Sequence, residues 1–177
     1  MRVALLTFLL VAFANTARAE CGPSATGTYF SCALQGGGEI DLCFENDTLV
    51  LREAGYELAS PIGALRYYPW GGYSMFNESV GFSEGAFSRV ISIGETRIYG
   101  PETETDPGTL SSVFWANVET VENWRAQDEK FLTSTACIAD SIVFSFDDAL
   151  RKAKNRAGLC WDQSVWAWIA CGGEQTD

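Results

Sequence analysis

The residues best suited to contact a ligand form an aromatic run between positions 67 and 76, with the sequence YYPWGGYSMF. Aromatic rings on a segment rich in Gly and Pro present rigid apolar area at a small entropic cost, which suits stacking against a sugar ring or a peptide. The alternative is that two or three of these rings are core side chains at a strand end, which is the commoner use of such residues. We name as candidate ligand-binding residues Tyr67, Tyr68, Trp70 and Tyr73.

The chain contains no histidine, which removes Ser-His-Asp and Cys-His catalysis, histidine metal sites and histidine acid–base chemistry together. The glycines at 36–38 lie between two expected strands and do not open a helix, so they form a turn and not a phosphate-binding loop. A carboxylate pair of the glycoside hydrolase kind is the chemistry that remains. The 23 acidic residues single out no such pair. We therefore expect a non-catalytic protein without a cofactor or metal site, and we rank a carboxylate-dependent hydrolase last.

Six cysteines follow the N-terminal segment, and an even number in an exported chain predicts three disulfides. Zinc binding is disfavoured because histidine and Cys-x-x-Cys pairs are absent. Six cysteines allow 15 connectivities. Cys32 shares the apolar face of an expected hairpin with Leu42, whereas Cys43 lies on the opposite face, so these two cysteines are poor partners. We predict the pairs Cys160–Cys171, which closes a hairpin, Cys32–Cys137 and Cys21–Cys43.

The first 19 residues have the organisation of a secretory signal peptide. A basic start at Arg2 precedes an apolar run, residues 3–14, and a small-x-small cleavage signal, residues 17–19. The run of twelve residues is well short of the roughly 20 that a spanning helix needs. An acid at Glu20 disfavours a lipid anchor on Cys21. We expect mature protein from Glu20 onward, without a membrane anchor, in the periplasm or secreted.

The chain is strongly acidic, with a formal net charge of −11. Removal of residues 1–19 leaves 10 basic and 23 acidic residues, a net charge of −13. Such a surface repels nucleic acid and anionic lipid heads, so we expect neither as a partner. It would attract a basic protein or a cationic ligand, although solubility alone is the commoner reason for such a charge. The partners that we expect are a basic protein or a cell-wall glycan.

Short strands separated by Gly, Asn, Asp and Pro must position these residues. This pattern predicts a mainly β protein, an antiparallel barrel or sandwich, whose β body ends at about residue 138. The residues between 122 and 131 fit a short helix or a charged hairpin arm. The expected strands are Thr28–Leu34, Glu39–Glu45, Thr48–Arg52, Ala64–Trp70, Ser79–Ser83, Phe87–Ile93, Arg97–Tyr99, Val113–Thr120 and Phe131–Ile138.

One short helix and a terminal hairpin complete the expected domain, which covers residues 20–177. The helix is expected at about 146–157, because its apolar residues share one face, Ser145–Asp148 resembles a capping box and Gly158 ends it. A hairpin rich in Trp follows at about 159–171. Trp166 and Trp168 would share one face of its second strand, a pattern more typical of core residues than of a ligand site.

Three segments resemble small periplasmic β-barrel proteins of Gram-negative bacteria. Phe30-Ser-Cys32 and Asp41-Leu-Cys43 resemble their first hairpin, and Leu132–Cys137 resembles their closing strand. The group includes the inhibitors of c-type lysozyme. The tail from Ala157 to Cys171 is similar to tails of uncharacterised alphaproteobacterial exported proteins.

The resemblance implies an exported binding protein, such as an inhibitor of a cell-wall hydrolase. The Ser-Gly-x-x-Tyr and Thr-Lys-Gly contact segments of the inhibitors are missing, so no inhibitory residue is carried over. Our alternative is a glycan- or peptidoglycan-binding protein that uses the aromatic run.

Overall fold

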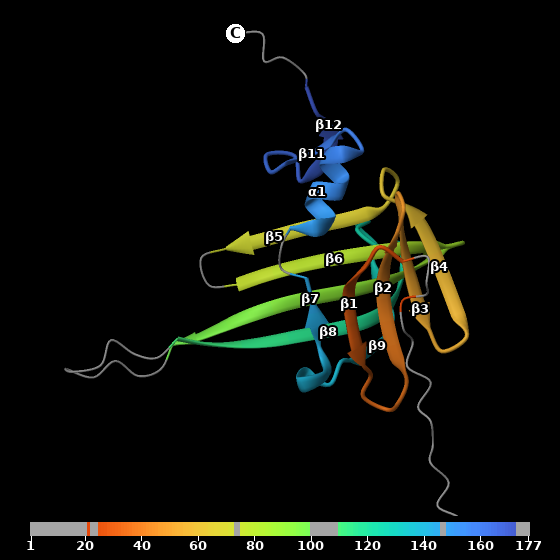
Figure 1. Ribbon diagram of the computed structural model, residues 1–177, viewed down its shortest axis with the longest axis vertical. Helices are drawn as coiled ribbons and strands as arrows, with labels where there is room; N and C mark the ends of the chain where they lie inside the picture. Colours follow the sequence, from red (N-terminus) through yellow and green to blue (C-terminus); the bar gives the residue numbers. More distant parts are fainter. Residues whose placement is uncertain (1–20, 22–24, 73–74, 100–109, 146–147, 173–177) are drawn as a thin grey trace, which may run out of the picture.

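The computed structural model describes residues 21, 25–72, 75–99, 110–145 and 148–172 (Figure 1). The expected signal peptide at 1–19 and Tyr73 lie outside these residues. No helix in the part of the chain that the structure describes is long and apolar enough to span a membrane.

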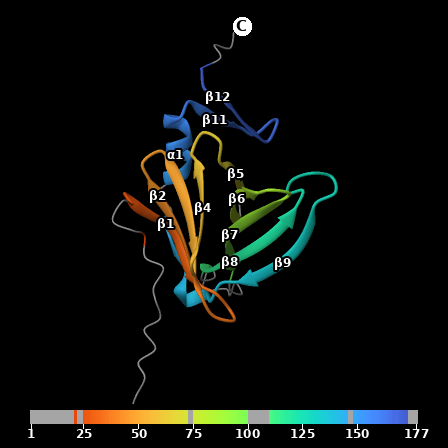
Figure 2. The ribbon, with the colours of Figure 1, turned by 90° about the vertical axis from the view of Figure 1, so that its right-hand side faces the viewer.

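Two five-stranded antiparallel sheets form the body of the protein, and they face each other as the layers of an open sandwich (Figure 2). This arrangement confirms the expected mainly β class. The first sheet has the order β10-β1-β2-β3-β4, with β1 at Gly27–Ala33, β2 at Glu39–Glu45, β3 at Thr48–Glu53, β4 at Tyr56–Pro61 and β10 at Val143–Phe144. The second follows chain order, with β5 at Arg66–Gly72, β6 at Met75–Glu84, β7 at Phe87–Tyr99, β8 at Leu110–Glu122 and β9 at Lys130–Ala136.

Alternating apolar residues of the two inner faces form one core. Phe30 and Leu42 from the first sheet are fully buried in the same cluster as Val80, Ile91 and Val118 from the second. Burial of each such side chain contributes about 1.5–3 kcal/mol relative to an exposed position. The period-2 pattern of the sequence therefore places one face of each strand inward and leaves the other face available for a surface site.

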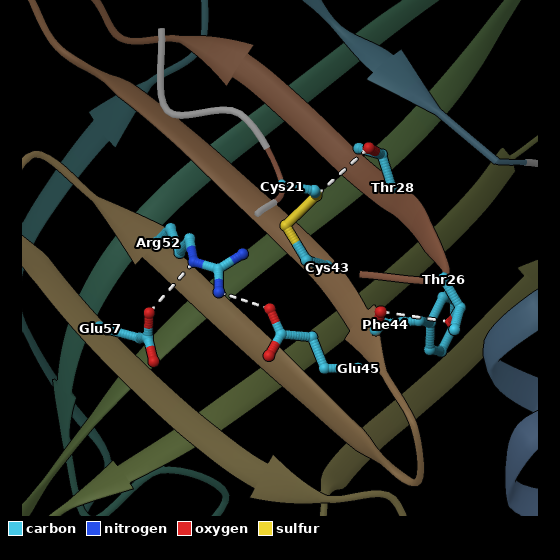
Figure 3. Close-up of polar contacts among 8 residues, drawn as sticks. All are labelled: Cys21, Thr26, Thr28, Cys43, Phe44, Glu45, Arg52 and Glu57. Carbon is cyan, nitrogen blue, oxygen red and sulfur yellow. Dashed lines mark hydrogen bonds and ion pairs between the residues drawn. A yellow bond between two sulfur atoms is a disulfide. The ribbon is translucent and has the colours of Figure 1, made fainter. Parts of the chain in front are cut away.

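The three disulfides join the same pairs of cysteines that were predicted from the sequence. Cys21–Cys43 lies on the outer face of the first sheet, beside the Arg52 ion pairs (Figure 3). Cys32–Cys137 connects the ends of β1 and β9, where Ile138 also donates a backbone hydrogen bond to Ala33. Cys160–Cys171 closes the terminal hairpin. Three disulfides indicate a protein of an oxidising compartment.

Some strand predictions are wrong in detail. Strands β4 and β10 were not predicted. The strands expected at 87–93 and 97–99, with a turn at Gly94 between them, are one continuous strand, β7. Gly94 is needed for packing, because a Cβ there would overlap the ring of Trp115 on β8. Residues 123–128 form a turn between β8 and β9, not a helix or hairpin arm.

Helix α1 at Ala149–Arg156 and the hairpin of β11 at Leu159–Asp162 and β12 at Ala167–Ala170 lie at one end of the sandwich (Figure 1). The short 3-10 helix η1 at Ala139–Ser141 lies at the opposite end. The start of the expected helix at 146–147 lies outside the described residues, and the N-cap Asp148 makes no side-chain capping hydrogen bond. Asp148 is therefore the N-cap of α1 and not the third helical residue, which is the position that the expected capping box gives it.

A buried lysine and a half-buried tryptophan attach α1 and the hairpin to β5 and the residue before it. The Lys154 ammonium donates to the carbonyl of Leu65 at 2.5 Å and lies 5.6 Å from the ring of Trp168. The Trp168 indole stacks on Tyr67 and donates to its carbonyl oxygen at 2.6 Å. The turn between β11 and β12 is thereby held near β5.

A buried carboxyl lies within the core. Glu78 on β6 is 3% exposed and accepts hydrogen bonds from the hydroxyls of Tyr29 and Tyr67. A bulge in β1 between Thr28 and Phe30 accompanies the inward position of Tyr29. Burial raises the pKa of Glu78, while both tyrosines and Arg151 lower it and Asp148 raises it further; the net shift is upward from 4.5.

This raised pKa predicts a pH dependence of stability. The folded state retains the Glu78 proton at pH values where the unfolded chain has released it, so Glu78 stabilises the fold most below its usual pKa. We expect the free energy of unfolding, relative to that of a Glu78→Gln variant, to fall as pH rises from 4.5 through the folded-state pKa. Urea unfolding of both proteins from about pH 4 to about pH 8 measures this difference. A constant difference would contradict the assignment.

Candidate functional site

A groove of about 600 Å³ lies on the outer face of β5 and β6, and we call it the aromatic groove. Its walls come from β5, from β6, from the β8–β9 turn and from the β11–β12 turn. The lining residues are Tyr68, Pro69, Trp70, Asn77, Ser79, Arg125 and Trp166.

The strand alternation of β5 divides the predicted ligand-binding residues between two faces. Tyr68 and Trp70 point to the outer face and line the groove, and Trp70 is 40% exposed. Tyr67 points inward and is 1% exposed in the core, so the structure corrects its expected contact with a ligand. Tyr73 lies outside the described residues. The aromatic run thus serves both as core and as groove wall.

The position of Tyr68 is fixed by neighbours from the β8–β9 turn. Trp124 meets the Tyr68 ring edge-on at a centroid distance of 5.3 Å and covers Gly81, where a Cβ would overlap the indole. The Arg66 guanidinium lies 4.6 Å from the Trp124 ring and hydrogen-bonds to the Trp124 carbonyl. The Arg125 guanidinium covers Tyr68 at 4.4 Å from the ring centroid. The Tyr68 wall of the groove is therefore preformed in the absence of a ligand.

Two groove residues have a backbone conformation that side chains rarely adopt. Arg125 has φ 66° and Trp166 has φ 52°, both in the left-handed region, where glycine is the usual residue. Such conformations cost of order 1–3 kcal/mol each and concentrate at functional sites. Both of these side chains line the groove, whereas Asn123, at φ 54° in the same β8–β9 turn, does not line it. This coincidence favours a functional reason for the two side chains.

Polar groups lie on the groove floor and continue across the sheet. Asn77 Oδ1 is buried and has no hydrogen-bond partner among the described residues. Ser79 is 8% exposed, and its Oγ lies 3.4 Å from that of Ser92. Glu119 accepts from the hydroxyls of Ser92 at 3.3 Å and Ser134 at 3.4 Å, and burial raises the pKa of its carboxyl. A ligand in the groove would meet hydrogen-bonding groups beneath aromatic walls.

Sequence reasoning missed four of the lining residues: Asn77, Ser79, Arg125 and Trp166. Asn77 and Ser79 follow from the alternation of β6 once its inner face is known. Trp166 was grouped with Trp168 on one strand face, but β12 begins only at Ala167, so Trp166 lies in the β11–β12 turn with a left-handed backbone. No local pattern brings Arg125 beside Tyr68, because their contact joins distant strands.

The described residues contain no group of three or more His, Cys, Asp or Glu that could hold a metal ion. They contain no free cysteine either. The arrangement of rings, amide and hydroxyls in the groove supports binding by stacking and hydrogen bonding.

The fold and the groove define a disulfide-bonded β-sandwich with an open aromatic site on one outer face. Comparisons with protein-family models, with curated proteins and with solved structures found no match. Function is therefore inferred from the groove itself, and the resemblance to lysozyme inhibitors stays a prediction.

Proposed function

We propose that this protein is an exported, non-catalytic glycan-binding protein and that the aromatic groove is its binding site. The observation that carries the proposal is the pairing of Tyr68, Trp70 and Trp166 with a polar floor. A sugar ring has apolar C–H faces and a polar rim, so it is complementary to aromatic walls above hydrogen-bonding groups.

The compartment narrows the class of glycan. An oxidising location, together with the signal peptide expected at residues 1–19, suits the bacterial periplasm or the extracellular space. Polymers of N-acetylated amino sugars from the cell wall are the saccharides that we propose as ligands. Asn77 lines the groove, and its side-chain amide is suited to hydrogen-bond an acetamido group.

The hydrolase-inhibitor hypothesis has weaker support. Its physical basis is the acidic charge, which would accelerate association with a basic enzyme. That charge belongs to the whole chain and does not identify a contact surface, whereas the groove gathers specific side chains in one place.

The direct test compares two aromatic residues of equal exposure. Trp70 lines the groove and Phe87 lies at the start of β7 outside its lining, and each is 40% exposed. We expect Trp70→Ala to weaken binding of the N-acetylglucosamine tetramer about tenfold or more, because truncation of a ring at a binding hot spot costs upward of ~2 kcal/mol.

Phe87→Ala is the matched control and should bind as the wild type does. Calorimetric titration and sedimentation with peptidoglycan sacculi measure both variants. Equal affinity of Trp70→Ala and Phe87→Ala for tetramer and sacculi would contradict the proposed site.

A further inference from the structure

We propose that the aromatic groove selects N-acetylated amino sugars that carry one carboxylate, and that Arg125 recognises this carboxylate. The inference rests on the proposed function and adds the charge of the ligand to it.

Arg125 is the only charged residue among the described residues that line the groove. Its guanidinium lies 4.4 Å from the centroid of Tyr68 and 5.9 Å from that of Trp124. Within the described part of the chain, the side chain has no ion pair with a carboxylate, although the Arg125 backbone N–H donates to Glu129 at 3.1 Å. A cation therefore faces the groove with aromatic contacts and without a carboxylate of the protein to neutralise it.

Two arginines of the sandwich are ion-paired, whereas Arg66, like Arg125, has no ion pair in the described part of the chain but donates to the Trp124 carbonyl and does not line the groove. Arg52 is paired with Glu45 and Glu57, as Figure 3 shows, and Arg89 is paired with Glu53 at 2.7 Å. The chain has 23 acidic and only 12 basic residues, so carboxylates are abundant. An arginine left without such a partner in a left-handed turn, as Arg125 is, fits a group kept for a ligand.

The stacked geometry suits a carboxylate. A guanidinium that lies over an aromatic ring keeps the N–H groups at its edge free, and these form two parallel hydrogen bonds to a carboxylate. The surrounding charge limits the ligand to few negative groups, because a net charge of −11 repels a polyanion. One cation in an acidic protein is therefore complementary to a saccharide with a single acid.

A matched pair of sugars tests this inference. The disaccharide of N-acetylglucosamine and N-acetylmuramic acid differs from di-N-acetylchitobiose by a lactyl ether that carries one carboxylate. We expect the wild type to bind the acidic disaccharide about tenfold more tightly, because hydrogen bonds between a guanidinium and a carboxylate are stronger than those between neutral groups. Arg125→Gln should remove this preference, so that the ratio of the two affinities, followed by NMR titration, falls to about one.

Arg125→Gly provides a second variant that is expected to fold, because glycine adopts φ 66° without strain. It should lose the preference in the same way, and thermal unfolding verifies that both variants are folded. Equal binding of the two sugars by the wild type, or a preference that survives in both variants, would overturn the inference and leave the proposed function standing. Tighter binding of trigalacturonate than of the acidic disaccharide would overturn the limit to one carboxylate. Absence of binding to either disaccharide and to the N-acetylglucosamine tetramer would instead refute the proposed function.

Discussion

Replacement of Trp166 by glycine is expected to weaken glycan binding about tenfold or more while leaving the fold as stable as the wild type. The ring lines the groove, is 49% exposed and contacts Trp161 edge-on at 6.2 Å. Loss of that contact costs about 0.5–1.5 kcal/mol. Glycine relieves the backbone strain at φ 52°, which raises the free energy of unfolding by about 1–3 kcal/mol. Glycine also has more conformational freedom in the unfolded chain, which lowers the free energy of unfolding by about 0.4–1 kcal/mol. At the middle of these ranges the terms nearly cancel, and their limits run from a loss of about 1.5 kcal/mol to a gain of about 2 kcal/mol in the free energy of unfolding.

Urea unfolding and titration with the N-acetylglucosamine tetramer measure the two effects on the same sample. Val165→Gly is the control, because Val165 is its chain neighbour, is 60% exposed and does not line the groove. A Trp166→Gly variant that is strongly destabilised yet binds the tetramer normally would contradict this prediction. It would show that the Trp166 ring stabilises the fold and does not bind the ligand.

Removal of the Cys32–Cys137 disulfide should give the largest loss of stability. Its cysteines are 105 residues apart, and both are almost fully buried where β1 meets the end of β9. In the chain-entropy model, opening a loop of that length costs about 4.7 kcal/mol, against about 3 kcal/mol for a short loop such as the one closed by Cys160–Cys171. The double variant Cys32→Ala/Cys137→Ala should therefore unfold at a lower urea concentration than Cys160→Ala/Cys171→Ala.

Chemical denaturation of the two double variants without reductant checks this order. The terminal pair is the matched control, because it closes a loop of only 11 residues in the same chain. A larger loss for Cys160→Ala/Cys171→Ala would contradict the view that the long-range disulfide joins the two sheets.

The sequence predicted correctly those features that depend on a single local pattern, such as strand alternation or helical periodicity. The alternation of Phe30, Cys32 and Leu42 on one face, with Cys43 on the other, separates the two cysteines as the structure does. Strand β2 has the predicted bounds, Glu39–Glu45. The clustering of apolar residues on one face and the stop at Gly158 identify α1, whose observed core is Ala149–Arg156.

It failed where distant contacts override local signals. Strand β4 has no buried residue, and its sequence, YELASP, has only a weak apolar alternation. Gly94 was read as a turn because the Trp115 ring that requires it lies on the next strand. For the groove, the composition of the aromatic run suggested a site, but the inward position of Tyr67 and the approach of Arg125 depend on how the strands and turns pack.

Mapping of a bound glycan by NMR tests the central claim most directly. Titration of isotope-labelled residues 20–177 with the N-acetylglucosamine tetramer should shift the backbone amides of Tyr68, Trp70, Asn77 and Arg125, together with the indole N–H of Trp166. A second cavity, of about 570 Å³, lies between α1, the β2–β3 turn and the end of β4. It is lined by residues such as Phe44, Ile62 and Arg156 and serves as the internal comparison. Shifts confined to the groove are the predicted result, and shifts at the second cavity or none at all would contradict the account.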